Sequence, residues 1–240
     1  MKFIVCETYE EMSKIGADMF AEVIKNDPKC ILGLATGSTP IGMYGELIKM
    51  NKAGEISFKE VTSYNLDEYY QLSPDHPQSY RYFMNNNLFN HVDINKENTF
   101  VPDGFAEDPN AYGKEYDAKI QAAGGIDIQV LGLGVNGHIA FNEPAEELCS
   151  STHLTDLTES TIKANSRFFE SEDEVPKKAL TMGLGSIMRS KKIIVLANGV
   201  AKHDVIAKLC GDEITTSCPA TLLKCHRDVT VICDKAAYNG

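Results

Sequence analysis

Seven short apolar runs, most of them separated by enough residues for a helix, constrain the fold of this chain more than any other feature. The runs are KFIVC (2–6), CILGLA (30–35), VTSYNL (61–66), NTFVP (98–102), IDIQVLGLG (126–134), KIIVLA (192–197) and DVTVIC (228–233). Such short, nearly continuous apolar runs are typical of strands that are buried on both faces of a sheet. Strands that alternate with helices predict an α/β fold with a mainly parallel sheet.

Helix-start signals lie between the runs. Thr8 and Glu11 have the spacing of a capping box, Pro40 opens a second predicted helix, and Asp108 precedes a third. We find no internal repeat, low-complexity tract or long linker. A chain of 240 residues can bury a large core, so we expect one domain over residues 1–240.

Charge and apolar content limit the classes of partner. The formal net charge is −11, and no block of Lys and Arg is present that could neutralise successive phosphates of a nucleic acid. No stretch approaches the roughly 18 apolar residues that a membrane span requires. We therefore expect a cytoplasmic protein that binds neither nucleic acid nor membrane.

Cysteine usage agrees with a reducing compartment. The chain has seven cysteines, an odd number, and Cys6, Cys30 and Cys233 lie in apolar runs, as expected of buried thiols. Cys218 and Cys225 are too far apart for a CxxC metal knuckle, so we expect no metal site.

The segment 131–145, LGLGVNGHIAFNEPA, follows the fifth run and matches GxGxxG. Pro144 interrupts the helix that a dinucleotide fingerprint requires, which argues against a nicotinamide cofactor. The glycines instead favour close approach to a ligand and leave room for His138. A lone histidine is often only structural, but Asn136 and Glu143 are near enough in sequence to orient this one, which favours an acid or base.

Two further runs end in residues suited to a site for a phosphorylated metabolite. Gly37, Ser38 and Thr39 precede the predicted helix at Pro40, where free backbone N–H groups bind phosphate, although a plain helix-capping turn has the same pattern. The turn lacks the lysine of a nucleotide P-loop. Asp67 follows the third run as a candidate base, or alternatively as a helix cap or a solvated strand end. Parallel strands open ligand sites at their carboxyl ends, so we expect these groups to converge.

Residues 150–178 are mostly polar and show no sustained apolar stripe. A long polar insertion in a compact α/β domain is either a lid over a site or a solvated surface loop. The pattern alone leaves both interpretations open.

Four motifs, ATGSTP, NLDEY, GHIAFNEPA and ANSRFF, occur in the order found in one known family. The chain resembles the glucosamine-6-phosphate deaminases (isomerising) over nearly its whole length. The resemblance implies a Rossmann-like three-layer αβα sandwich and no cofactor. It also implies conversion of glucosamine 6-phosphate and water to fructose 6-phosphate and ammonia.

The resemblance assigns a role to each matching residue. His138 becomes the base that opens the sugar ring, with Asn136 and Glu143 in support. Asp67 becomes the base that takes the C2 proton and returns it at C1.

The same resemblance places the substrate phosphate on Gly37, Ser38 and Thr39, with Arg167 and Lys202 as cationic clamps. Arg167 lies inside the polar segment, so the resemblance favours the lid interpretation. A guanidinium on a closing segment could bind phosphate and exclude water.

Three departures from the family pattern bear on regulation and tuning. Some members have Asp in place of Asn136, and an amide orients an imidazole without balancing its charge. Allosteric, hexameric members carry basic residues at the positions of His153 and Thr155 and have a longer carboxyl terminus. We therefore expect no activation by N-acetylglucosamine 6-phosphate, and the choice between monomer and homo-oligomer stays open.

Two alternative functions have the same kind of fold. A 6-phosphogluconolactonase-like hydrolase has a similar Gly-His loop, but NLDEY and ANSRFF argue against it. A non-catalytic sugar-phosphate sensor of the repressor type carries a helix-turn-helix ahead of the sensor, whereas the first run here begins at Lys2. We expect an enzyme.

Overall fold

The computed structural model describes residues 1–166, 169, 171 and 174–240. Within them, a seven-stranded sheet has the order β1-β10-β9-β6-β2-β3-β5, and all its strand pairs are parallel. Its strands are β1 (Lys2–Cys6), β2 (Ile31–Leu34), β3 (Thr62–Asn65), β5 (Thr99–Phe100), β6 (Ile128–Gly132), β9 (Lys192–Ala197) and β10 (Val229–Asp234). Each of the seven apolar runs forms one strand, so the predicted parallel sheet is confirmed.

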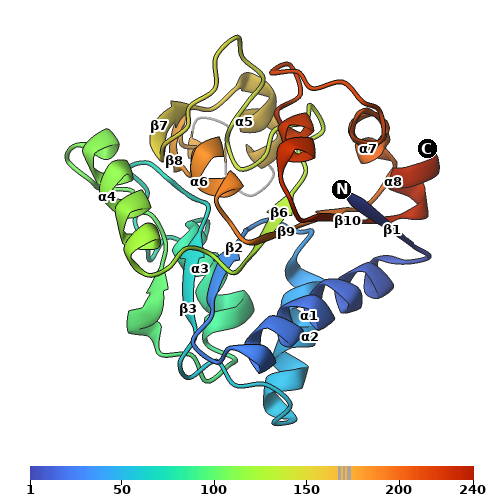
Figure 1. Cartoon of the computed structure of the whole chain (residues 1–240). Helices are drawn as coiled ribbons and strands as arrows, with labels where there is room; N and C mark the ends of the chain where they lie inside the picture. The colour runs from blue at the N-terminus through green and yellow to red at the C-terminus, as the bar shows by residue number, and fades with distance from the viewer. Residues whose placement is uncertain (167–168, 170, 172–173) are drawn as a thin grey trace.

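Helices cover both faces of this sheet and make three layers (Figure 1). The α1 and α2 helices pack against each other on one side, whereas α7 and α8 lie on the other. The helices are α1 (Tyr9–Asn26), α2 (Ile41–Lys52), α3 (Tyr80–Met84), α4 (Pro109–Ala122), α5 (Glu159–Ser166), α6 (Leu184–Met188), α7 (His203–Cys210) and α8 (Lys235–Asn239). Short 3-10 or π turns are η1 (Asn85–Phe89), η2 (Lys96–Asn98), η4 (Val200–Lys202) and η5 (Pro219–Cys225).

The helix-start signals act as the sequence predicts. The Thr8 side chain accepts a hydrogen bond from the Glu11 backbone N–H, and the Asp108 side chain accepts one from the Ala111 N–H. Each bond satisfies an N–H group that the first turn of a helix leaves without a backbone partner. The apolar face of α1 then enters the main core, where Phe20 is fully buried.

A second sheet, which the sequence did not predict, lies beside the first. It contains three antiparallel strands in the order β4-β8-β7. They are β4 (Asp67–Tyr69), β7 (His153–Asp156) and β8 (Lys178–Thr181). The β7 strand and α5 both fall within residues 150–178, so this polar segment is structured at its start. The polar pattern of the segment did not predict β7, because the residues of this strand are half-buried or exposed.

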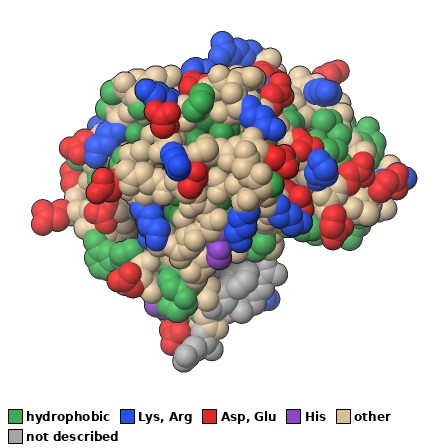
Figure 2. All heavy atoms as spheres, turned by 90° about the horizontal axis from the view of Figure 1, so that it is seen from below, with side chains coloured by type: hydrophobic (Ala, Val, Ile, Leu, Met, Phe, Trp, Pro, Cys, Tyr) green, Lys and Arg blue, Asp and Glu red, His purple; other side chains and the backbone are tan. Residues whose placement is uncertain are grey.

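Charged side chains of both signs are interspersed on the face shown in Figure 2. No helix among the described residues is both long enough and apolar enough to cross a membrane. All seven cysteines are free thiols, and Cys6, Cys30 and Cys233 are buried as predicted.

Candidate active site

The loops that follow the parallel strands surround a cavity of about 300 Å³. Seven of the nine predicted site residues line it: Gly37, Ser38, Thr39, Asp67, Asn136, His138 and Lys202. Glu143 lies behind His138 and is hydrogen-bonded to it. Arg167 lies outside the described residues. The predicted convergence of the strand-end motifs is therefore present in the structure for the described members of the set.

The turn at residues 37–39 joins β2 to α2 at one wall of the cavity. Gly37 has a φ of 94°, a conformation that glycine adopts without strain. Pro40, the N-cap residue of α2, makes no side-chain capping hydrogen bond. The backbone N–H groups and positive helix dipole there suit an anion.

A second loop, between β9 and η4, completes this wall. The Thr39 hydroxyl donates to Asn198 Oδ1 at 3.1 Å, so the two loops are tied together. Lys202, at the end of η4, lines the same cavity. Its ammonium group adds a positive charge to the lining of the cavity.

Asp67 follows β3 as predicted, but it is neither a helix cap nor a solvated strand end. It begins β4, the first strand of the second sheet, and pairs with Thr181 of β8. Its side chain faces the cavity but is only 7% exposed. Burial, followed by the charge of Glu68, raises the pKa of Asp67 to about 8.

Glu68 faces away from this cavity, because successive strand residues point to opposite sides of a sheet. Its carboxylate accepts the backbone N–H groups of Tyr69, Tyr80 and Arg81. These bonds hold the start of α3, and they place Tyr80 in the cavity wall near Asp67.

His138 and Glu143 form a closely hydrogen-bonded pair. His138 Nδ1 lies 3.2 Å from Glu143 Oε2. Since a carboxylate only accepts, Nδ1 carries the proton in the neutral imidazole and Nε2 is left as the basic nitrogen. Asn136 bridges the pair: its amide donates to Glu143 Oε2 at 2.7 Å, and its oxygen accepts the His138 backbone N–H.

The other oxygen of Glu143 accepts hydrogen bonds from two residues that are not among the predicted site residues. Thr161 donates to Oε1 at 2.6 Å and Thr158 at 3.3 Å. Burial acts to raise the pKa of Glu143, but hydrogen bonds with His138, Thr161 and Asn136 outweigh it and lower the pKa to about 2. Both threonines lie in the polar segment, where serine and threonine are too common to single out.

Glycine at position 134 makes room for the imidazole. A Cβ placed there would lie 2.5 Å from atoms of the His138 ring. Gly137 has a φ of 87° and packs against Cys218, which leaves no space for a side chain. Residues 138–149, all of them described, contain no helix. Gly134 therefore leaves room for His138, as predicted, and no dinucleotide-binding helix follows Gly137 in these residues.

An aromatic wall closes the cavity beside Asp67. Tyr80 and Phe141 both line it, and their rings stack with centroids 6.2 Å apart. Burial raises the pKa of Tyr80 well above its usual value, so its hydroxyl stays neutral. Phe141 lies within the GHIAFNEPA motif but was assigned no role, and no sequence pattern marked Tyr80, because aromatic side chains are also common in cores.

Within the described residues, no group of three or more His, Cys, Asp or Glu side chains is arranged to hold a metal ion. The polar groups of the cavity are the buried carboxyl of Asp67, the His138 imidazole with its Glu143 partner, and a turn whose backbone N–H groups suit an anion. This set suits proton transfers on a small phosphorylated molecule.

Comparison with known proteins agrees with this geometry. The family model described as glucosamine-6-phosphate isomerases/6-phosphogluconolactonase matches residues 7–232. The chain belongs to this family. A glucosamine-6-phosphate deaminase of Clostridium perfringens is 60% identical, over 99% of this chain and 98% of that protein. One from Thermoanaerobacter pseudethanolicus is 56% identical, over 99% of this chain and 94% of that protein.

Solved structures in the family show the same fold. A monomeric glucosamine-6-phosphate deaminase superposes with a TM-score of 0.96 at 46% identity, over 99% of this chain and 98% of that chain. A 6-phosphogluconolactonase from Leishmania guyanensis has a TM-score of 0.72 at 21% identity, over 98% of this chain and 97% of that chain. The second likeness concerns the fold alone. The Rossmann-like αβα architecture is therefore that of the family.

Proposed function

We propose that this protein is a glucosamine-6-phosphate deaminase, which converts glucosamine 6-phosphate and water to fructose 6-phosphate and ammonia. One observation carries the proposal: a single cavity contains an anion-binding turn, the buried carboxyl of Asp67 and the His138–Glu143 pair. The names of the full-length relatives support the same activity. The substrate is thus a small molecule, and we expect a cytoplasmic enzyme without a nucleic-acid or membrane partner.

The phosphate of the substrate binds at the turn formed by Gly37, Ser38 and Thr39. Backbone N–H groups and the α2 dipole meet its negative charge, and Lys202 adds a cation. Arg167 is proposed as a second cation by its motif alone. Holding the remote phosphate fixes the sugar carbons against the reacting groups, which lowers the entropic barrier of each proton transfer.

His138 opens the sugar ring. Its Nε2 takes the proton of the C1 hydroxyl and delivers a proton to the ring oxygen, so the bond between C1 and that oxygen breaks as the aldehyde forms. Glu143 holds the ring through Nδ1 and stabilises the imidazolium that forms between the two transfers.

Asp67 then moves a proton between adjacent carbons. Its carboxylate takes the C2 proton and returns it at C1, while the ammonium group gives up a proton and the aldehyde oxygen gains one, which leaves an iminium at C2 and a hydroxyl at C1. Water adds to C2, and ammonia leaves. The carboxyl must be ionised for this step, and the ammonium group of the substrate would lower its pKa from the value of about 8 in the empty cavity.

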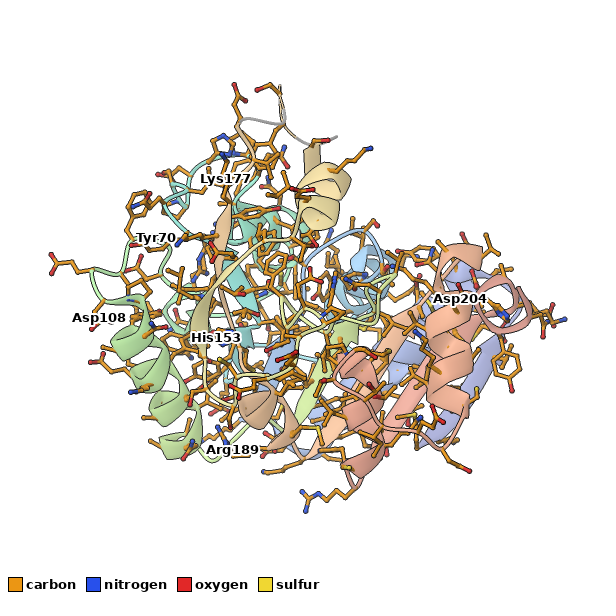
Figure 3. The ribbon with its side chains drawn as sticks, turned by 90° about the horizontal axis from the view of Figure 1, so that it is seen from above. Tyr70, Asp108, His153, Lys177, Arg189 and Asp204 are labelled. Carbon is orange, nitrogen blue, oxygen red and sulfur yellow. The ribbon has the colours of Figure 1, made fainter. Side chains whose placement is uncertain are left out.

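Residues 150–178 are proposed as a lid of this single domain. The start of the segment is anchored, since β7 lies along α4 (Figure 3) and the buried Asp117 of α4 accepts hydrogen bonds from the Thr152 N–H and hydroxyl. The α5 helix reaches the site through Thr161 and Glu143. Closure of the later part would exclude water from the cavity.

The test is ammonia release from glucosamine 6-phosphate by the purified protein in a coupled assay. We expect turnover with hyperbolic saturation and no activation by N-acetylglucosamine 6-phosphate. Hydrolysis of 6-phosphogluconolactone without ammonia release from the amino sugar would support the lactonase alternative. Calorimetric binding of the amino sugar without turnover would support a sensor.

A further inference from the structure

The turn that we propose for phosphate binding is held from behind by a residue of another helix. Tyr9 is the first residue of α1, and its hydroxyl lies 3.2 Å from the Ser38 carbonyl oxygen and 3.0 Å from that of Thr39. The same hydroxyl accepts the Gly42 backbone N–H at 2.8 Å. One phenol therefore contacts the turn and the first turn of α2 together.

This contact depends on the close approach of α1 and α2, which lie side by side in Figure 1. A Cβ at position 42 would lie 2.8 Å from the Tyr9 ring and would overlap the Ser13 hydroxyl. Glycine at this position therefore lets the phenol reach the α2 backbone. Position 42 has no positive φ, so the close approach is the reason for glycine here.

The direction of these bonds bears on anion binding. A hydroxyl that donates to the Ser38 and Thr39 carbonyls keeps these negative dipoles turned toward α1. The Ser38 carbonyl shares its peptide with the Thr39 N–H, which therefore points away from Tyr9, whereas the peptide after Thr39 has no N–H because residue 40 is proline. An anion on the far side of the turn from Tyr9 can then accept the Thr39 N–H, while the two carbonyl oxygens bound by Tyr9 are held away from it.

We infer that Tyr9 is a positioning residue for phosphate recognition, whose hydroxyl orients the 37–39 turn. The inference rests on the proposed function for its substrate, but binding of inorganic phosphate tests it separately. Tyr9 itself does not line the cavity. Its effect should therefore appear in phosphate affinity and KM, with little change in the chemical steps that Asp67 and His138 carry.

The experiment compares the wild type with Tyr9→Phe, which removes the hydroxyl alone. Tyr238→Phe is the matched control, since Tyr238 is an exposed tyrosine of α8. The measurements are the Kd of inorganic phosphate by calorimetry, KM and kcat for ammonia release, and Tm. Loss of phosphate-binding energy worth about one hydrogen bond predicts a rise of about fivefold in both Kd and KM, with kcat within about twofold.

An unchanged phosphate Kd in folded Tyr9→Phe overturns the inference, even if its Tm falls, because a purely structural role would lower Tm alone. An equal loss in kcat would also contradict it. Should Tyr9→Phe not fold, Gly42→Ala displaces the phenol from the other side, and an unchanged Kd in that variant overturns the inference as well. If the wild type binds phosphate but releases no ammonia, the proposed function fails while the Kd comparison still decides the role of Tyr9.

Discussion

Asp67 and Glu143 are two carboxyl groups at one site, yet their surroundings move their pKa values in opposite directions. Burial and the charge of Glu68 raise the pKa of Asp67 to about 8. Burial also acts on Glu143, but hydrogen bonds from several donors lower its pKa to about 2. Among the described residues, none donates a hydrogen bond to the Asp67 carboxyl. Asp67 is the more deeply buried of the two and has no donor in the described part of the chain, whereas Glu143 has several donors and the charge of His138 beside it, so one carboxyl can take a proton and the other stays charged.

The same contrast gives opposite pH dependences of stability. The folded protein keeps the Asp67 proton up to about pH 8, whereas the ordinary pKa of this carboxyl is 3.8, so Asp67 lowers the stability of the fold as the pH rises between the two values. The ordinary pKa of Glu143 is 4.5; this residue contributes stability above that pH and loses it as the pH falls toward about 2.

Replacement of Asp67, the buried carboxyl for which the structure describes no hydrogen-bond donor, should have the largest effect on activity. Asp67→Asn removes the base for C2, so kcat for ammonia release should fall by about a thousandfold or more. Because the amide is never charged, the variant should also melt at a higher temperature than the wild type at pH 9, by roughly 2–4 °C per kcal/mol gained. A coupled ammonia assay and thermal melts at pH 5 and 9 measure both effects.

Asp75→Asn, in an exposed loop, is the matched control and should match the wild type in both measurements. Substantial activity in Asp67→Asn would contradict the role of this residue. A Tm difference that is the same at pH 5 and pH 9 would contradict the raised pKa.

Removal of the charge of Glu143, the carboxyl that accepts several hydrogen bonds, should have the next largest effect on activity. Glu143→Gln keeps the shape but leaves the His138 imidazolium without a negative partner, so kcat should fall by about a hundredfold. Steady-state kinetics measure the change, and Glu146→Gln, an exposed neighbour on the same loop, should be unaffected. Equal activities of the two variants would show that Glu143 has no role in the mechanism.

A smaller loss is expected when one donor to Glu143 is removed. Thr161→Val replaces the hydroxyl that lies 2.6 Å from Oε1 with a methyl group of similar size. Activity should fall by about tenfold, in line with a hydrogen bond to a charged group. The pKa of Glu143 should rise, as carboxyl NMR would show. Thr161→Ser keeps the donor and should restore both properties; equal losses in the two variants would point to packing instead.

The smallest effect is expected for Asn136→Asp. This change replaces the amide that donates to Glu143 Oε2 with a second negative charge. The added charge favours protonated forms of its neighbours, so the acid limb of kcat/KM should move to higher pH. The maximal kcat should change by less than about threefold, because the backbone bond to His138 is kept. An unshifted pH profile would show that Asn136 only orients the loop.

Several features of the site could be predicted from the sequence because they depend on neighbouring residues. The turn at 37–39, Asp67, and the run from Asn136 to Glu143 all follow strands whose apolar pattern is plain, and parallel strands open at one edge of a sheet. Thr161 and Tyr80 could not be predicted, since each reaches the site from a distant segment and carries no local signal. The second sheet was missed because its strands are short and β7 is only half-buried.

The sequence by itself determined the seven parallel strands, the capped helices and the membership of the family, because apolar periodicity and motif spacing are local properties of the chain. Only the tertiary structure decided that the Asp67 carboxyl is buried, that several hydrogen-bond donors surround Glu143, and that Tyr9 contacts the turn before α2. Burial and hydrogen-bond direction depend on which distant segments pack together, and no spacing along the chain records that.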